Sequence, residues 1–110
     1  MKVIVQHMNR NEITGNTEGF TNVAEVDVSS LANNSRMDML EYAYRWTNNI
    51  MGSWSRTDIE DNGDYNPDVT RLVPLHEGGY GLRSTMMFDR MIIDGTTYEV
   101  SAFGFERIAA

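Results

Sequence analysis

The chain contains no cysteine, so disulfide bonds, thiolate nucleophiles and cysteine-ligated zinc are excluded. Lysine is almost as scarce, because Lys2 is the only one and the other basic residues are arginines scattered along the sequence. No apolar run approaches the roughly 20 residues that a membrane-spanning helix needs. The first residues also lack the apolar segment and the cleavage site of a secretory signal. We therefore expect no membrane partner, and a reducing cytoplasm is permitted but not required.

Positive charge is in deficit as well. Nine basic residues face 16 acidic ones, which gives a formal net charge of −7. Because an acidic surface is repelled by phosphate backbones, direct nucleic-acid binding is disfavoured. A hydrophobic content of 41% and a charged content of 23% are otherwise typical of globular proteins. The length of 110 residues predicts a single domain, residues 1–110, with one modest core.

Several segments alternate apolar and polar residues with the period of a β-strand. Asp94-Gly95, between the last two of them, is a strong hairpin signal. Pro74 lies in the short strand predicted over residues 69–75 and confines that strand to the edge or end of a sheet. Residues 9–19 are rich in turn formers and predict a loop. The predicted strands cover residues 2–8, 20–28, 69–75, 90–93 and 96–103.

One amphipathic helix is predicted over about residues 36–51. Ser35 can cap its start, and Asp38 places a negative charge in its first turn. Gly52 is suited to end it in a left-handed conformation. The apolar stripe at helical spacing consists of Met39, Leu40, Ala43, Thr47 and Ile50. These elements predict an α+β fold, a small and mainly antiparallel sheet with the helix packed on one face.

The loop after the helix resembles a calcium-binding loop in its spacing of oxygen ligands. Val69 stands where such a loop needs a bidentate glutamate, and Pro67 interrupts the helix that should follow. A solvated turn is the competing interpretation, and we expect neither a bound metal nor a cofactor. The candidate calcium ligands are Asp58, Glu60, Asn62 and Asp64, with Gly63 at the glycine position.

Signals for catalysis are few. His7 and His76 are the only histidines, and no serine lies in a Gly-x-Ser-x-Gly setting. The glycine-rich residues 76–81 match neither a dinucleotide fingerprint nor a phosphate-binding loop. We therefore predict no catalytic residue and a protein that is not an enzyme. A small enzyme or ligand-binding domain that uses residues 76–81 is an alternative.

Aromatic side chains suggest a surface for a partner protein, because large aromatics dominate binding hot spots. Packing in the core is the competing interpretation. The predicted partner-binding residues are Tyr42 and Trp46 at helical spacing, Trp54 after the helix, and Tyr65 in the following loop.

The C-terminal quarter of the chain carries a recognisable frame of residues. Arg83-Ser84 comes first, Asp89 precedes a strand, Asp94-Gly95 forms the turn, and Gly104-Phe105 closes the block. This frame resembles small bacteriophage-encoded proteins of unassigned function. Those proteins favour small residues and glycine before the strand, whereas residues 85–88 here are Thr-Met-Met-Phe.

The residues of this block have a physical interpretation too. Asp89 can accept hydrogen bonds from turn amides or pair with Arg83, which would fix the start of the hairpin. Gly104 between Phe103 and Phe105 predicts a bulge that lets both rings find cover.

The resemblance implies a phage accessory protein in the host bacterial cytoplasm that binds and modulates a host bacterial protein without catalysis. One alternative is an anti-defence inhibitor that imitates nucleic acid through an acidic face. That face would include Asp58, Glu60, Asp61 and Asp64. Another alternative is a virion or assembly component. The host target and the oligomeric state are left open by the sequence.

Overall fold

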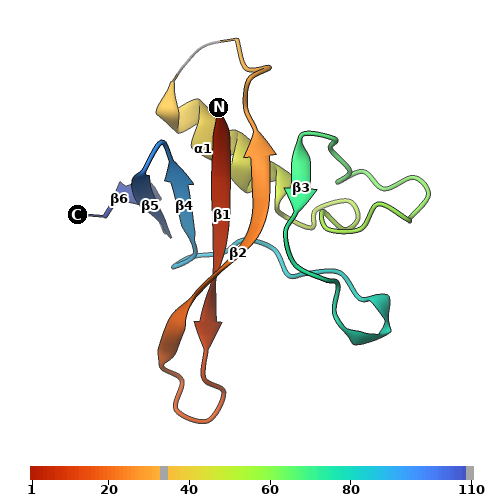
Figure 1. Ribbon diagram of the computed structural model, residues 1–110, viewed down its shortest axis with the longest axis horizontal. Helices are drawn as coiled ribbons and strands as arrows, with labels where there is room; N and C mark the ends of the chain where they lie inside the picture. The colour runs from red at the N-terminus through yellow and green to blue at the C-terminus, as the bar shows by residue number, and fades with distance from the viewer. Residues whose placement is uncertain (33–34, 109–110) are drawn as a thin grey trace.

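The computed structural model describes residues 1–32 and 35–108. Within these residues six strands form one antiparallel sheet in the order β3-β2-β1-β4-β5-β6, with one α-helix beside it (Figure 1). The predicted α+β fold is confirmed. The elements are β1 (Lys2–Arg10), β2 (Thr17–Asp27), α1 (Arg36–Trp46), β3 (Val69–Arg71), a 3₁₀ turn (Glu77–Gly79), β4 (Arg90–Ile93), β5 (Thr96–Ser101) and β6 (Gly104–Arg107).

Strand β1 lies at the centre of the sheet, between β2 and β4. Alternate residues of a strand point to the same face, so the register decides which side chains meet in the core. Buried apolar residues of three neighbouring strands line up on the helix side: Val3 with Val26 and Ile93, and Val5 with Ala24 and Met91. Met39, Leu40 and Ala43 of α1 pack in the same core. Strand β3 is three residues long and lies at an edge, as Pro74 predicts.

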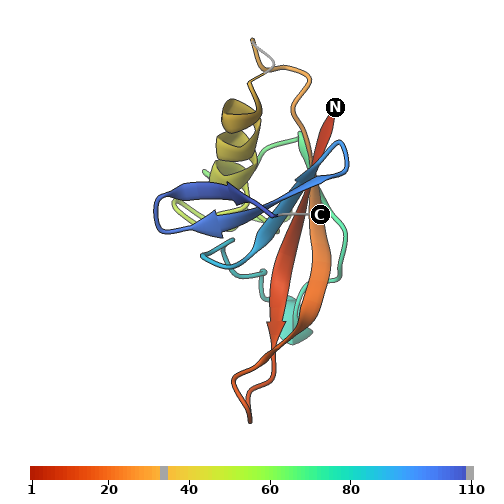
Figure 2. The same cartoon turned by 90° about the vertical axis from the view of Figure 1, so that its left-hand side faces the viewer.

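The β1–β2 hairpin extends well beyond the rest of the sheet, as an arm that Figures 1 and 2 show projecting away from the helix. Its loop is only residues 11–16, because both strands continue into the predicted loop of residues 9–19. The Asn11 side chain accepts hydrogen bonds from the amides of Ile13 and Thr14, and Gly15 adopts a φ of 73°. This Asn turn replaces the longer loop that composition alone predicts.

The helix begins as predicted and ends earlier. Ser35 caps it by accepting a hydrogen bond from the Asp38 amide. The last helical residue is Trp46 rather than Met51, and Ile50 is exposed instead of continuing the apolar stripe. Gly52 is therefore not the C-cap. The backbone leaves the helix because the amides of residues 50–52 donate to a distant carboxylate instead of to helical carbonyls.

The C-terminal strands form two successive hairpins. Asp94 and Gly95 both adopt positive φ, which is the turn geometry that an Asp-Gly pair favours. The predicted strand 96–103 ends at Ser101, and a further strand, β6, begins at Gly104. Gly104, with a φ of 131°, thus ends a turn and is not a bulge. Figure 2 shows β5 and β6 curling beside the helix.

Only one of the two rings beside Gly104 finds cover, contrary to the prediction. Phe105 packs edge-on against Tyr44 of α1, with ring centroids 5.9 Å apart. Phe103 lies at the tip of the turn and is fully exposed.

Replacing Phe105 with alanine should lower the free energy of unfolding by about 2 kcal/mol, because it removes the half-buried ring that ties β6 to the helix. Phe103→Ala is the matched control and should change it by less than about 0.5 kcal/mol. Urea denaturation followed by circular dichroism measures both. Equal losses in the two variants would contradict this account of β6.

Candidate functional site

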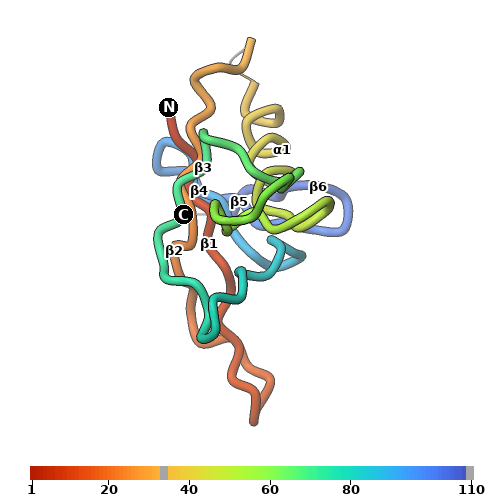
Figure 3. The backbone as a smooth tube through the Cα atoms, turned by 90° about the vertical axis from the view of Figure 1, so that its right-hand side faces the viewer, coloured from red at the N-terminus to blue at the C-terminus, as the bar shows by residue number. Residues whose placement is uncertain are grey.

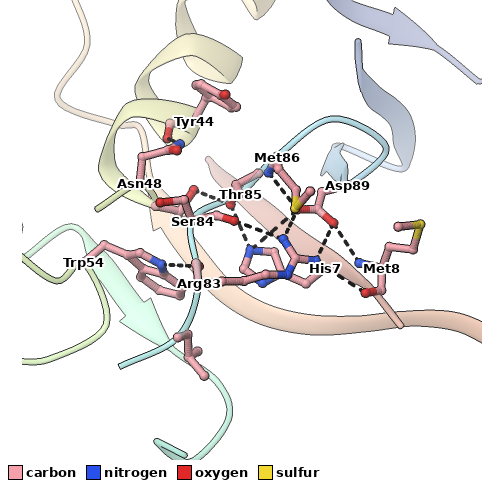
Figure 4. Close-up of polar contacts among 12 residues, drawn as sticks. His7, Met8, Tyr44, Asn48, Trp54, Arg83, Ser84, Thr85, Met86 and Asp89 are labelled. Atoms are coloured by element: carbon pink, nitrogen blue, oxygen red, sulfur yellow. Dashed lines mark hydrogen bonds and ion pairs between the residues drawn. The ribbon is translucent and has the colours of Figure 1, made fainter. Parts of the chain in front are cut away.

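An ion pair between the partly exposed Arg83 and the buried Asp89 lies just before β4 and bonds the backbone of β1 (Figure 4). The Asp89 side chain is fully buried, and its two oxygens accept from the two terminal nitrogens of Arg83 at 2.6 and 2.9 Å. Asp89 also accepts from the backbone amides of Met8 and Met86, both at 2.8 Å. Both roles expected for Asp89, pairing with Arg83 and binding turn amides, are therefore present together.

Asp89 is held in its ionised form. Burial by itself would raise the pKa of this carboxyl, but the bond to Arg83 and the amides of Met8 and Met86 outweigh burial and lower the pKa below its ordinary value. A buried carboxylate with one guanidinium and two amides as donors has little residual need for solvent.

His7 of β1 lies next to this pair and is only 6% exposed. Its Nε2 atom is 3.0 Å from the Thr85 hydroxyl and 4.0 Å from Asp89 Oδ2. The Thr85 hydroxyl donates to Thr47, and the Thr47 hydroxyl donates to the Ala43 carbonyl. The Thr85 hydroxyl has one proton and donates it to Thr47. In the bond between His7 and Thr85, His7 Nε2 must therefore be the donor. A chain of hydrogen bonds thus connects β1 to the end of α1.

The same surroundings keep His7 neutral. Burial lowers the pKa of His7 to about 4, and the positive charge of Arg83 adds to the effect while Asp89 opposes it. The arrangement differs from a nucleophilic triad, in which one ring nitrogen faces the nucleophile and the other faces the acid. Here the same nitrogen faces Thr85 and Asp89, and Thr85 is 1% exposed. The network is suited to holding segments together.

A cavity of about 380 Å³ opens beside the network. It brings together the two histidines that lie far apart in the sequence, His7 and His76, next to Arg83 and apolar side chains such as Val23 and Leu82. Residues 76–81, on the border of this cavity, are held by two backbone hydrogen bonds of their own. The His76 amide donates to the Tyr80 carbonyl, and the Gly79 amide donates to the His76 carbonyl, so the segment forms a closed turn.

The candidate calcium loop is organised around a buried aspartate instead. Asp64 is fully buried, and its Oδ2 accepts from the amides of Ile50, Met51 and Gly52 at 2.8, 2.9 and 2.7 Å. Its Oδ1 accepts from Arg45 at 3.1 Å. Burial would raise the pKa of Asp64, but these four donors outweigh it and lower the pKa.

The other predicted calcium ligands are not gathered around Asp64. Asn62 bonds the backbone of Ser53 and Arg56, Asp58 pairs with Arg56, and Glu60 is exposed. Among residues 1–32 and 35–108, no group of three or more His, Asp or Glu side chains is placed to hold a metal ion. The buried Asp64 also cannot belong to an acidic face that imitates nucleic acid.

The predicted partner-binding aromatics separate into different environments. Trp54 is 4% exposed, and its indole donates to the Arg83 carbonyl, so it belongs to the core and not to a partner surface. Its position follows from the connection between α1 and β3, which lies on the helix side of the sheet (Figure 3). Tyr42 and Trp46 are half-buried on α1, with ring centroids 6.4 Å apart, and Tyr65 is exposed.

A group of exposed apolar side chains lies elsewhere, in the segment before β4. Met86, Met87 and Phe88 follow one another just before the buried Asp89 and are 47%, 41% and 51% exposed. We call these three residues the apolar loop. Phe88 adopts a φ of 78°, in the left-handed region that bulky residues avoid.

None of the helices among the described residues is long and apolar enough to cross a membrane. No protein family, no curated protein and no solved structure matches this chain.

The buried His7 should make stability depend on pH. Between pH 6.5 and 4 the unfolded chain binds a proton at His7 while the folded protein does not. The free energy of unfolding should therefore fall as the pH is lowered through this window, by up to about 3 kcal/mol from His7. Urea denaturation at a series of pH values measures the slope. His7→Gln should flatten it and the exposed His76→Gln should not; an unchanged slope in His7→Gln would refute this assignment.

Replacing Asp64 with asparagine should lower the free energy of unfolding by about 3 kcal/mol, because an amide group cannot accept from three backbone amides and Arg45 together. Asp58→Asn, in an exposed pair with Arg56, is the control and should have little effect. Adding calcium chloride should leave the melting temperature of the wild type unchanged. A calcium-dependent rise that Asp64→Asn removes would restore the calcium-site interpretation.

Proposed function

We propose that this protein is a non-enzymatic binding protein whose partner is another protein, and that the apolar loop is the centre of the contact. The observation that carries the proposal is the loop itself. It has three consecutive exposed apolar side chains, and its backbone is hydrogen-bonded to the buried Asp89 carboxylate. Exposed apolar groups of this kind mark interaction sites more often than isolated ones do.

The backbone of the apolar loop is held in place by several hydrogen bonds. The Met86 amide donates to the buried Asp89 carboxylate, the Asp89 amide donates to the Met86 carbonyl, and the Phe88 amide donates to Val100 of β5. A loop that is already ordered loses little conformational freedom when a partner binds. The geometry therefore favours binding by a rigid surface.

Phe88 has the properties of an anchor. Its left-handed backbone costs on the order of 1–2 kcal/mol for a residue with a Cβ atom, and the surrounding hydrogen bonds sustain this conformation. Aromatic side chains are prominent among binding hot spots, and methionine adapts to irregular apolar surfaces. An aromatic anchor flanked by two methionines suits an apolar depression on a partner protein.

The class of partner comes from the sequence resemblance and not from the geometry. The similarity of residues 83–108 to bacteriophage proteins supports an accessory protein that acts in the host bacterial cytoplasm. On this proposal the partner is a host bacterial protein whose activity changes when the apolar loop occupies its surface. The saturated hydrogen bonds of Asp89 and the neutral His7 support a structural role for the buried network.

A second candidate function is favoured by the cavity between His7 and His76. Its volume falls within the usual range for small-ligand pockets, and its lining is mainly apolar with a few polar groups. A ligand-binding domain would use this cavity, with the exposed His76 as the accessible polar group.

Met87→Asp should abolish capture of the partner, because it places a charge in the middle of the apolar loop. Wild-type and variant proteins are immobilised, exposed to bacterial lysate, and compared by quantitative mass spectrometry. The captured protein is then purified and titrated, and Met87→Asp should weaken its binding at least about tenfold.

Met37→Asp is the matched control, since Met37 is a methionine of similar exposure on α1. It should retain the partner at the wild-type level, with both variants showing wild-type circular dichroism. Equal recovery of every protein by wild type and Met87→Asp would contradict the role of the apolar loop. Loss of capture by both variants alike would contradict its specificity.

A further inference from the structure

A groove of about 380 Å³ lies where the arm meets β4, with Phe88 on its border. Figure 1 shows these segments in neighbouring parts of the sheet, with β1 between β2 and β4. Its lining combines apolar walls with two arginines and one acid. We call it the arginine groove and define it by Met8, Arg10, Phe20, Phe88, Arg90 and Glu99.

Arg90 is unusual among the arginines of this protein. Its guanidinium carbon lies 4.2 Å from the centre of the Phe20 ring, so one face of the group is stacked. Its Nε atom is buried and has no hydrogen-bond partner. A buried donor without an acceptor is costly and uncommon in folded proteins. The stack on Phe20 accounts for the orientation of the guanidinium, whereas the unpartnered Nε atom is not explained by folding.

The charges of the groove are also unpaired. Four other arginines lie within 4.0 Å of an aspartate: Arg36, Arg45, Arg56 and Arg83. Within residues 1–32 and 35–108, neither Arg10 nor Arg90 has such a partner. Glu99 faces Arg90 across the β4–β5 ladder and lines the groove, but it does not come within that distance. Among the described residues Arg71 and Arg107 lack such a partner too, but Arg10 and Arg90 differ from them because both line the same groove.

We propose that the arginine groove binds a small organic carboxylate with an apolar body. The carboxylate occupies the side of the Arg90 guanidinium that carries Nε, which presents two parallel donors in the geometry that a carboxylate matches. Arg10 supplies the second positive charge, and the apolar body lies against Phe20, Phe88 and Met8. Because Nε is buried in the unliganded protein, the groups that cover it must move for the carboxylate to reach it.

The balance of charge selects the class of ligand. Two arginines and one glutamate leave the groove with a single excess positive charge, which a monocarboxylate neutralises. Phosphate at neutral pH carries more negative charge and would be repelled by Glu99 and by the acidic protein as a whole. The two phenylalanine rings favour an aromatic or branched body over a fully polar one.

The probe for this site is phenylacetate, added to the ¹⁵N-labelled protein and followed by NMR. We expect a saturable shift of the Arg90 Nε–H resonance, with a dissociation constant on the order of 1 mM. Phenylacetamide, which has the same shape without the charge, and inorganic phosphate should not produce it. No saturable shift, or an equal shift with phenylacetamide or with phosphate, would overturn the proposal.

Four variants sharpen the test. Arg10→Gln should weaken phenylacetate binding at least about threefold, and Glu99→Gln should strengthen it by a similar factor because an opposing charge is lost. Arg90→Gln should abolish the shifts of neighbouring backbone amides. Arg107→Gln, at an exposed arginine of β6, is the control and should leave binding unchanged. If Arg10→Gln and Arg107→Gln behave alike, or Glu99→Gln weakens binding, the proposed charge recognition is wrong.

This site and the apolar loop can be tested separately. Met87→Asp, which should abolish partner capture, changes no residue that lines the arginine groove and should leave the phenylacetate shift in place. Failure of the NMR test would therefore not contradict partner binding by the apolar loop. Failure of the partner-capture test would likewise not contradict carboxylate binding in the arginine groove.

Discussion

The Asp89 carboxylate is the interaction on which the candidate sites depend. It connects β1, the segment before β4 and Arg83 through four hydrogen bonds at a place that water does not reach. A buried charge is tolerated only when all its partners are in place, so these segments have one favourable arrangement. That arrangement positions the apolar loop directly before Asp89. It also sets the surroundings of His7, and it fixes the point at which Arg90 begins β4.

The same device recurs at Asp64, where a buried carboxylate gathers three amides and Arg45 and thereby ends the helix. The protein has no cysteine and therefore no disulfide bond. The segment between α1 and β3 and the segment before β4 are instead each held by an aspartate that bonds an arginine and backbone amides. A guanidinium can bond both oxygens of a carboxylate, as Arg83 does, whereas a lysine presents a single point of charge. This requirement accounts for part of the preference for arginine. Four arginines of the described residues take no part in such pairs, and two of them, Arg10 and Arg90, lie together in the arginine groove.

Local sequence signals predicted much of the fold because they depend on neighbouring residues alone. The Ser35 cap, the Asp94-Gly95 turn and the alternation of β1 are examples, and the Arg83–Asp89 pair spans only six residues. The errors arose where a distant partner decides the outcome. The helix ends at Trp46 because Asp64 takes the following amides, and Trp54 is buried because its indole meets the Arg83 carbonyl. The bond between His7 and Thr85 joins residues 78 positions apart, so no window of sequence could reveal it.

Phe88 shows where the requirements of folding and of function separate. If position 88 served only to turn the chain toward Asp89, glycine would adopt its positive φ without strain. Phenylalanine at this position carries the free-energy cost of the positive φ. Burial of apolar surface offsets little of that cost, because Phe88 stays 51% exposed. The hydrogen bonds of the turn come from the backbone and from Asp89, so they do not require this side chain. The ring therefore contributes little to the isolated fold. Phe88 belongs to both the apolar loop and the lining of the arginine groove, so on our two proposals its ring serves the contacts made at these surfaces.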